Sequence, residues 1–212
     1  MLFRSYVFDG NDPPPADLEG TVICARESLT IYQAWNLALG LVSTPLVMNL
    51  NLDDRLAPDA VQTLQDLMQQ EKAIAAGGDW KICYSQADTD AVVPCYPAAE
   101  VAVVREWPPA VGTLGRLGSS TGERGLGPAV MWRMDAHLGA PRYPWRFSDG
   151  TPIRVVADLA WWGVLKEHLR GKILRVPKIV GNYYSHPGEQ AEFRTSPNQE
   201  LVTLQRIGIS LL

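Results

Sequence analysis

Cysteine is scarce in this sequence, and the cysteines that occur form no recognisable pattern. Cys24, Cys83 and Cys95 are widely spaced and odd in number. This arrangement fits neither a framework of several disulfides nor the paired spacing of a zinc site. We therefore expect the protein in a reducing compartment, and we predict a cytoplasmic location.

Long apolar runs and an excess of positive charge are also missing. No apolar run approaches the roughly 18 residues of a membrane-spanning helix, and no signal-peptide pattern is visible. The formal net charge of −4 argues against nucleic acid or an anionic membrane surface as the main partner. With 212 residues, of which 46% are hydrophobic and 20% charged, the chain has the composition of one globular domain, which we place at 1–212.

The spacing of apolar residues predicts alternating strands and helices up to about residue 85. Strands are predicted at Phe3–Phe8, Thr21–Ala25, Leu46–Leu50 and Trp80–Tyr84, and helices at Leu29–Val42 and from Pro58 to Met68. This alternation is typical of an α/β protein with a parallel-type sheet.

The remainder of the chain is less regular. It predicts helices at Pro128–Leu138, Val155–Leu169 and Glu200–Ile209, and two strands, Lys172–Val176 and Ile179–Tyr184, joined by a turn at Pro177. The stretch Gly112–Gly127 holds six glycines and is predicted to be a long loop. A loop of this length is either a lid over a site or a plain connection.

Two adjacent carboxylates, Asp53 and Asp54, follow the predicted strand Leu46–Leu50. The carboxyl end of a strand is where open α/β sheets bind ligands. Two unit charges about 4 Å apart repel by roughly 1 kcal/mol in water and by about 4 kcal/mol at a surface-like dielectric. A hard divalent cation relieves this repulsion and prefers carboxylate oxygen. The ordinary alternative is a solvated turn before the next helix.

Several segments, in order, resemble the family-2 glycosyltransferases. They are Ala34-Trp35-Asn36, Asn51-Leu52-Asp53-Asp54-Arg55, Pro58-Asp59, Gly127 to Arg133, Ala157 to Trp162 and Val180 to Tyr184. The resemblance implies a GT-A fold, which is a Rossmann-like α/β fold with a mainly parallel central sheet flanked by helices. It also implies that 1–85 binds nucleotide and metal and that 86–212 forms the acceptor side.

The resemblance implies roles for the acidic residues and for one histidine. Asp54 would bind the Mn²⁺ or Mg²⁺ that bridges the donor diphosphate, and Asp53 would lie near the ribose and the metal. His186 could be a third metal ligand, although a lone histidine is more often structural. Asp158 would be the catalytic base that accepts the proton of the acceptor hydroxyl, with an aspartate at a helix N-terminus as the alternative.

Three further residues are implied on the nucleotide side. Asp9 would contact the nucleobase, with a turn aspartate before Gly10 as the alternative. Arg26 could also face the base, unless it is an ordinary exposed arginine. Asn36 would belong to the cofactor-binding helix, and its alternative is a polar residue that faces water.

The sequence departs from the family at its first strand. We align Phe3–Phe8 with the second strand of the family, so that the usual first strand and helix have no counterpart. An alternative alignment makes Phe3–Phe8 the first strand. Our alignment predicts that a central strand is lacking, which leaves a row of backbone groups unpaired. Several explanations are open. The true start lies upstream of Met1, the sheet is rearranged or completed by another chain, or the protein no longer binds its donor in the family's way.

The resemblance predicts a metal-dependent, inverting transfer of a sugar from a nucleotide-sugar, a UDP-sugar above all, to a hydroxyl acceptor. The first alternative is a non-catalytic module that binds UDP without turnover. A second alternative is a metal-dependent phosphohydrolase that uses the same carboxylates, for which no glycine-rich phosphate loop is present. The sequence leaves the sugar, the acceptor and a possible oligomer open.

Overall fold

The computed structural model describes residues 4–10, 13–97, 103–104, 129–138, 142–154, 157–158, 161, 172–184 and 200. The helices are α1 (Ile31–Leu39), α2 (Ala60–Glu71), α3 (Gln86–Asp90) and the 3-10 helix Met134–Leu138. The strands are β1 (Ser5–Asp9), β2 (Thr21–Ala25), β3 (Leu46–Met48), β4 (Arg55–Leu56), β5 (Ala73–Cys83), β6 (Tyr96–Pro97), β7 (Val103–Val104), β8 (Val130–Arg133) and β9 (Lys172–Tyr184). The predicted loop Gly112–Gly127, most of the helix Val155–Leu169, the helix Glu200–Ile209 beyond its first residue, and His186 lie outside the described residues.

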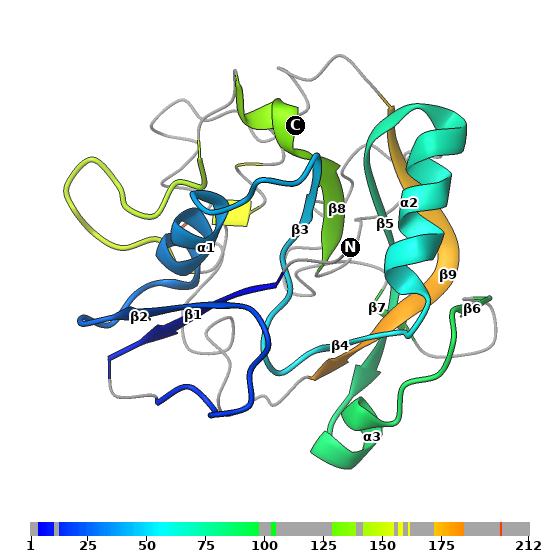
Figure 1. Ribbon diagram of the computed structural model, residues 1–212, viewed down its shortest axis with the longest axis horizontal. Helices are drawn as coiled ribbons and strands as arrows, with labels where there is room; N and C mark the ends of the chain where they lie inside the picture. The colour runs from blue at the N-terminus through cyan, green and yellow to red at the C-terminus, as the bar shows by residue number, and fades with distance from the viewer. Residues whose placement is uncertain are drawn as a thin grey trace.

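A central sheet of seven strands carries the fold (Figure 1). Its main path is β3-β8-β5-β9-β4, and β6 and β7 pair with β9 and β5. The long β5–β9 ladder is parallel, whereas the shorter ladders in this sheet are antiparallel. The predicted α/β fold is confirmed, but the sheet is mixed, because strands such as β8 and β4 run against their neighbours.

The first two strands stand apart from the central sheet. β1 and β2 pair in parallel, Ser5 with Thr21 through Asp9 with Ala25, in a separate sheet of two strands. Figure 1 shows this pair beside α1, away from β5 and β9.

Local sequence explains where the helices begin and end. Thr30 caps α1 by accepting from the Gln33 backbone N–H, while the Gln33 side chain accepts from the Thr30 backbone N–H, which forms a capping box. Helix α2 has no such cap, but it buries Ala60, Leu64 and Met68 at spacings of four residues and ends at Lys72 in a left-handed conformation.

The predicted helix Pro128–Leu138 is wrong. Its first part is strand β8, which pairs with β3 on one side and β5 on the other, and only Met134–Leu138 is helical. Within β8, Val130 and Trp132 belong to one apolar cluster and Met131 to the other. A strand buried on both faces has a continuous apolar sequence, which apolar spacing does not distinguish from a short buried helix.

The predicted turn at Pro177 is also wrong, because β9 continues through it. Val176 pairs with Gly78 and Ile179 pairs with Asp79, so Pro177 and Lys178 form a bulge in the ladder. Proline has no N–H to donate, and a bulge is a position where a strand does not require that donor. The two predicted strands are therefore one strand of 13 residues.

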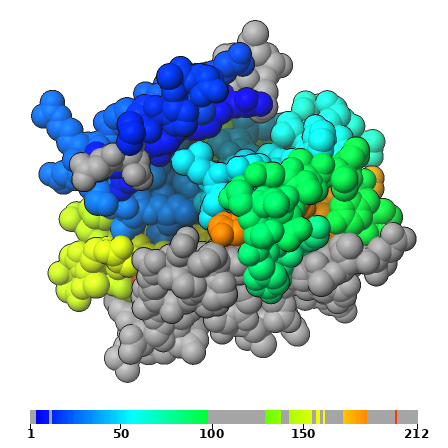
Figure 2. All heavy atoms as spheres, turned by 90° about the horizontal axis from the view of Figure 1, so that it is seen from below, coloured from blue at the N-terminus to red at the C-terminus, as the bar shows by residue number. Residues whose placement is uncertain are grey.

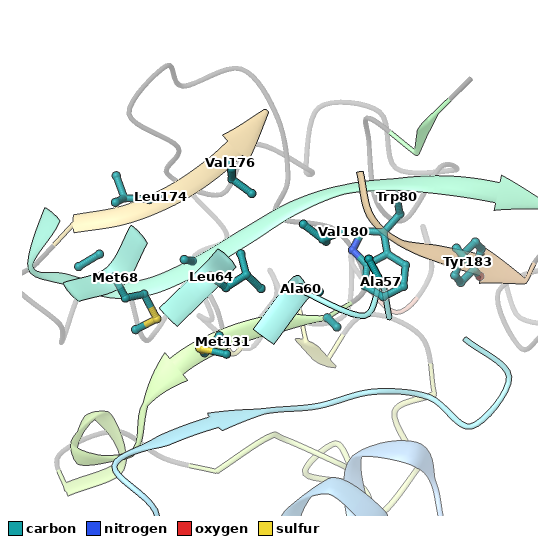
Figure 3. Close-up of a cluster of buried hydrophobic side chains, with 13 residues drawn as sticks. Ala57, Ala60, Leu64, Met68, Trp80, Met131, Leu174, Val176, Val180 and Tyr183 are labelled. Atoms are coloured by element: carbon teal, nitrogen blue, oxygen red, sulfur yellow. The ribbon is translucent and has the colours of Figure 1, made fainter. Parts of the chain in front are cut away.

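Two apolar clusters cover opposite faces of the central sheet. Ala75 of β5 belongs to the first cluster and Ala76 to the second, and Ile173 and Leu174 of β9 alternate in the same way. The first cluster includes residues of α1 and of the segment after β8, whereas the second packs beneath α2 (Figure 3). This arrangement gives a layered α/β fold with a sheet at its centre.

Candidate active site

The Asp53-Asp54 turn lies at the carboxyl end of the parallel β5–β9 ladder. It directly precedes β4, whose Arg55 pairs with Asn182 of β9. The Oδ1 atom of Asp54 accepts a hydrogen bond from the backbone N–H of Tyr184 at 3.1 Å. Figure 2 looks toward this edge, where the end of β9 (orange) lies between the segment after β3 (cyan) and the α3 region (green). The turn therefore connects β3 to β4 beside the end of β9.

Asp54 is buried with one oxygen unsatisfied. Asp54 is 2% exposed, and its Oδ2 atom has no hydrogen-bond partner among the described residues. Burial, and then the charge of Asp53, raise the pKa of Asp54 to about 8, although hydrogen bonds from Tyr184 and Asn51 oppose the shift. Burial also raises the pKa of Asp53, although this residue lies at the surface. A buried carboxyl with an orphaned oxygen is a group that a cation would satisfy.

Asn51 is the residue of this site that sequence reasoning missed. Its side chain hydrogen-bonds Asp54, and its own Oδ1 atom is buried without a partner in the described part of the chain. An amide oxygen and a carboxylate oxygen, both orphaned, are hard ligands for a divalent cation. The available signal is its position two residues before Asp53, at the start of the Asn51-Leu52-Asp53-Asp54-Arg55 segment.

The neighbouring Arg55 does not neutralise the carboxylates directly. Its Nε atom pairs with Asp90 at 2.8 Å, and one of its terminal nitrogens donates to the backbone carbonyls of Leu52 and Asp54 at 2.8 and 2.9 Å. Arg55 therefore braces the backbone of the turn against α3, while its charge acts to lower the pKa of Asp53 and of Asp54.

No group of three or more histidine, cysteine, aspartate or glutamate side chains could hold a metal within the described ranges. His186, the predicted third ligand, lies outside them. Any ion at Asp54 would therefore need further oxygen atoms from a bound ligand, from water, or from residues such as Asn51.

Asp158 lies on the other side of the central sheet from α2, among aromatic side chains. The hydroxyl of Tyr32 in α1 donates to Asp158 Oδ1 at 3.2 Å. Asp158 is half-buried, and its neighbours Ala157 and Trp161 are buried in the first apolar cluster. Asp158 thus contacts α1, whereas Asp54 contacts the end of β9.

Two of the three residues predicted on the nucleotide side, Asp9 and Asn36, form hydrogen bonds within the protein. Asp9, at the end of β1, accepts hydrogen bonds from Ser28 and from the backbone of Leu29. Arg26 is exposed just after β2. The side-chain amide of Asn36 donates from Nδ2 to the Tyr143 carbonyl at 2.8 Å and accepts at Oδ1 from the Tyr143 N–H at 3.0 Å. Asp9 thus orders the approach to α1, and Asn36 fastens α1 to the segment 142–154.

Comparison with known structures identifies the fold. The chain is similar to the crystal structure of residues 1–349 of TarS, a glycosyltransferase of S. aureus, with a TM-score of 0.52 and 11% identity. The match covers 82% of this chain and 45% of the TarS chain, so the protein spans less than half of that structure. The chain has a Rossmann-like GT-A fold of the glycosyltransferase type. This degree of identity establishes the fold alone.

Comparison at the level of sequence finds no match. No family model matches the chain, and no curated protein matches it either. In the described residues, no helix is both long and apolar enough to cross a membrane.

Proposed function

We propose that the protein transfers a sugar from a nucleotide-sugar, a UDP-sugar in the first instance, to a hydroxyl acceptor with the help of a divalent cation. The observation that supports this most directly is the orphaned, buried Oδ2 of Asp54 at the carboxyl end of the parallel ladder. In a fold of the GT-A type, this edge is a place where a ligand with negative charge and a cation can meet.

The residues at the turn fit Mn²⁺ or Mg²⁺. Asp54 Oδ2 and Asn51 Oδ1 are unpartnered hard oxygens in the described part of the chain, and Asp53 adds negative charge beside them. A bound cation would act as a Lewis acid for the leaving diphosphate. The protein's own part is to hold these oxygens in place, through the Tyr184 N–H and the Arg55 brace.

Asp158 is the proposed catalytic base. It is the half-buried carboxylate that the fold sets among aromatic side chains, on the segment that the family resemblance assigns to the acceptor. A carboxylate there can take the proton from an acceptor hydroxyl while the hydroxyl oxygen attacks the sugar. Direct displacement of this kind inverts the sugar carbon.

A second candidate is a nucleotide-binding module without turnover. The observation that favours it is the separation of the β1–β2 pair from the central sheet, since Asp9 ends β1 and Arg26 follows β2. If those residues no longer face the donor base, UDP could bind through the cation alone, without the sugar being held for reaction.

The test is calorimetric titration of the protein with UDP, with and without Mn²⁺. We expect micromolar binding that requires the ion, and we expect Asp54→Ala to abolish it while the thermal unfolding transition persists. The matched control is Asp66→Ala, which removes an exposed carboxylate of α2 away from the turn. Equal affinity of the Asp54→Ala variant and the wild type in Mn²⁺ would remove the metal assignment. Binding without transfer from any UDP-sugar would favour the second candidate.

A further inference from the structure

Two buried tyrosines lie near Asp158 and differ in one respect. Tyr32 and Tyr143 are 3% and 2% exposed, and their rings stack at 6.1 Å with an interplanar angle of 26°. The Tyr32 hydroxyl donates to Asp158 Oδ1 at 3.2 Å. The Tyr143 hydroxyl is buried without a partner among the described residues. Both residues therefore carry a buried hydroxyl, but among the described residues only the Tyr32 hydroxyl donates a hydrogen bond to the Asp158 carboxylate.

The surrounding rings hold Tyr32 and Tyr143 in place. Trp35 meets the edge of both, at centroid distances of 5.5 and 5.1 Å, and Trp161 lies 4.4 Å from Tyr143. Asn36 fixes the backbone of Tyr143 through two hydrogen bonds. A buried ring packed on several sides cannot change rotamer without disturbing its neighbours. The Tyr32 hydroxyl is thus presented to Asp158 from a rigid support.

The electrostatic setting keeps both phenols protonated. Burial and then the charge of Asp158 raise the pKa of Tyr32 well above 10, and the same two causes raise that of Tyr143. A neutral phenol is a hydrogen-bond donor at every pH at which the protein would work. Tyr32 therefore meets Asp158 as a donor, and donation to a carboxylate stabilises its charged form.

We propose that Tyr32 is a positioning residue for Asp158. Its hydroxyl fixes Oδ1 of the carboxylate and favours the ionised state that a base requires. The proposal rests on the proposed function, in which Asp158 takes the acceptor proton. A base held in one rotamer meets each acceptor hydroxyl in the same geometry, which lowers the entropy cost of reaching the transition state.

The decisive experiment measures Asp158 directly and needs no substrate. Carboxyl carbons of aspartate are labelled with ¹³C, the Asp158 signal is assigned from its loss in Asp158→Asn, and its pH titration is followed by NMR. Tyr32→Phe removes the donor and keeps the ring, so we expect the pKa of Asp158 to rise by at least about half a unit. Tyr143→Phe is the matched control, since it removes an equally buried hydroxyl that has no hydrogen-bond partner among the described residues, and we expect a smaller change.

A rise in Tyr32→Phe no larger than in Tyr143→Phe would overturn the proposal, provided that both variants melt near the wild-type temperature. Once a donor is found, the acidic limb of the pH profile of kcat/KM should move upward in Tyr32→Phe by the same amount as the titration. The titration tests the Tyr32–Asp158 hydrogen bond, and the activity measurements test the proposed function. Absence of transfer, or full activity of Asp158→Asn, would refute the proposed function and leave the NMR result to decide the hydrogen bond.

Discussion

At the scale of single residues, Asp54 combines deep burial with a neighbouring like charge. Because burial and Asp53 raise its pKa to about 8, the carboxyl is largely protonated at neutral pH in the folded protein. A cation must displace that proton in order to bind. Metal affinity should therefore increase with pH up to about 8 and change little above it, since the deprotonated form then predominates.

The same shift predicts how stability depends on pH. In the unfolded chain Asp54 releases its proton near its ordinary pKa of 3.8, whereas the folded protein holds it to about 8. The folded state binds more protons in this window, so its stability should fall as pH rises from about 4 to about 8, by up to about 1.4 kcal/mol per unit. Urea unfolding of the wild type and of Asp54→Asn at several pH values measures this difference.

Asp54→Asn keeps the size of the side chain and cannot ionise. Its free energy of unfolding should therefore rise relative to that of the wild type as the pH increases through this window. Asp53 contributes in the same direction, which is why the difference between the two proteins is the relevant quantity. Stability curves that stay parallel from pH 4 to pH 8 would show that Asp54 ionises normally.

Asp158 allows a separate prediction about catalysis. Asp158→Asn retains the shape of the side chain and removes its ability to accept a proton. We expect UDP binding near the wild-type value and transfer reduced by roughly 100-fold or more, the usual scale for a general base. Initial rates with a UDP-sugar, beside calorimetry with UDP on the same variant, separate the two effects. Unchanged rates would exclude Asp158 as the base.

At the scale of elements, strand β9 depends on a buried ion pair on either side of its bulge. Arg175 binds Asp79 of β5 through two nitrogens, one of them at 2.8 Å from Oδ1, and Asp79 is 1% exposed. Arg175 precedes Pro177, whereas Asp79 pairs with Ile179 beyond it. The ion pair therefore ties the two ends of the bulge together.

Removing one partner should be costly. Arg175→Met leaves the Asp79 charge buried and unpaired, so we expect a loss of about 3–5 kcal/mol in the free energy of unfolding, measured in urea. The control is Lys172→Met on the same strand, whose pair with Glu71 at 3.0 Å is exposed and should be worth about 1 kcal/mol or less. The double variant Arg175→Met/Asp79→Leu should recover much of the loss. Equal effects of Arg175→Met and Lys172→Met would contradict this role.

Elements also show where sequence reasoning succeeds and fails. Strand Thr21–Ala25 and the core of helix Ile31–Leu39 were predictable, because local apolar spacing and a capping box define them. The strand character of β8 and the passage of β9 through Pro177 were not. Both depend on partners distant in sequence: β8 is buried between β3 and β5, and the bulge in β9 exists only against β5.

At the scale of the whole molecule, the layering places the two carboxylate positions. Asp54 lies where β4 joins the end of β9, while Asp158 contacts α1 within the aromatic cluster on one face of the sheet. The segment that carries Asp54 and the strand that ends at Tyr184 are far apart in the sequence. The hydrogen bond between these two residues joins positions 130 residues apart. Such a contact has no signature in local sequence.

The sequence by itself determined the α/β class, the strand-then-carboxylate pattern of Asp53 and Asp54, and the order of segments that resembles a glycosyltransferase. Those features follow from short-range spacing and residue chemistry. Only the tertiary structure decided which carboxylate is buried, that Asn51 joins it, that Asn36 binds Tyr143, and that Tyr32 reaches Asp158. These depend on desolvation and on contacts across the fold, and both arise only when distant segments pack together.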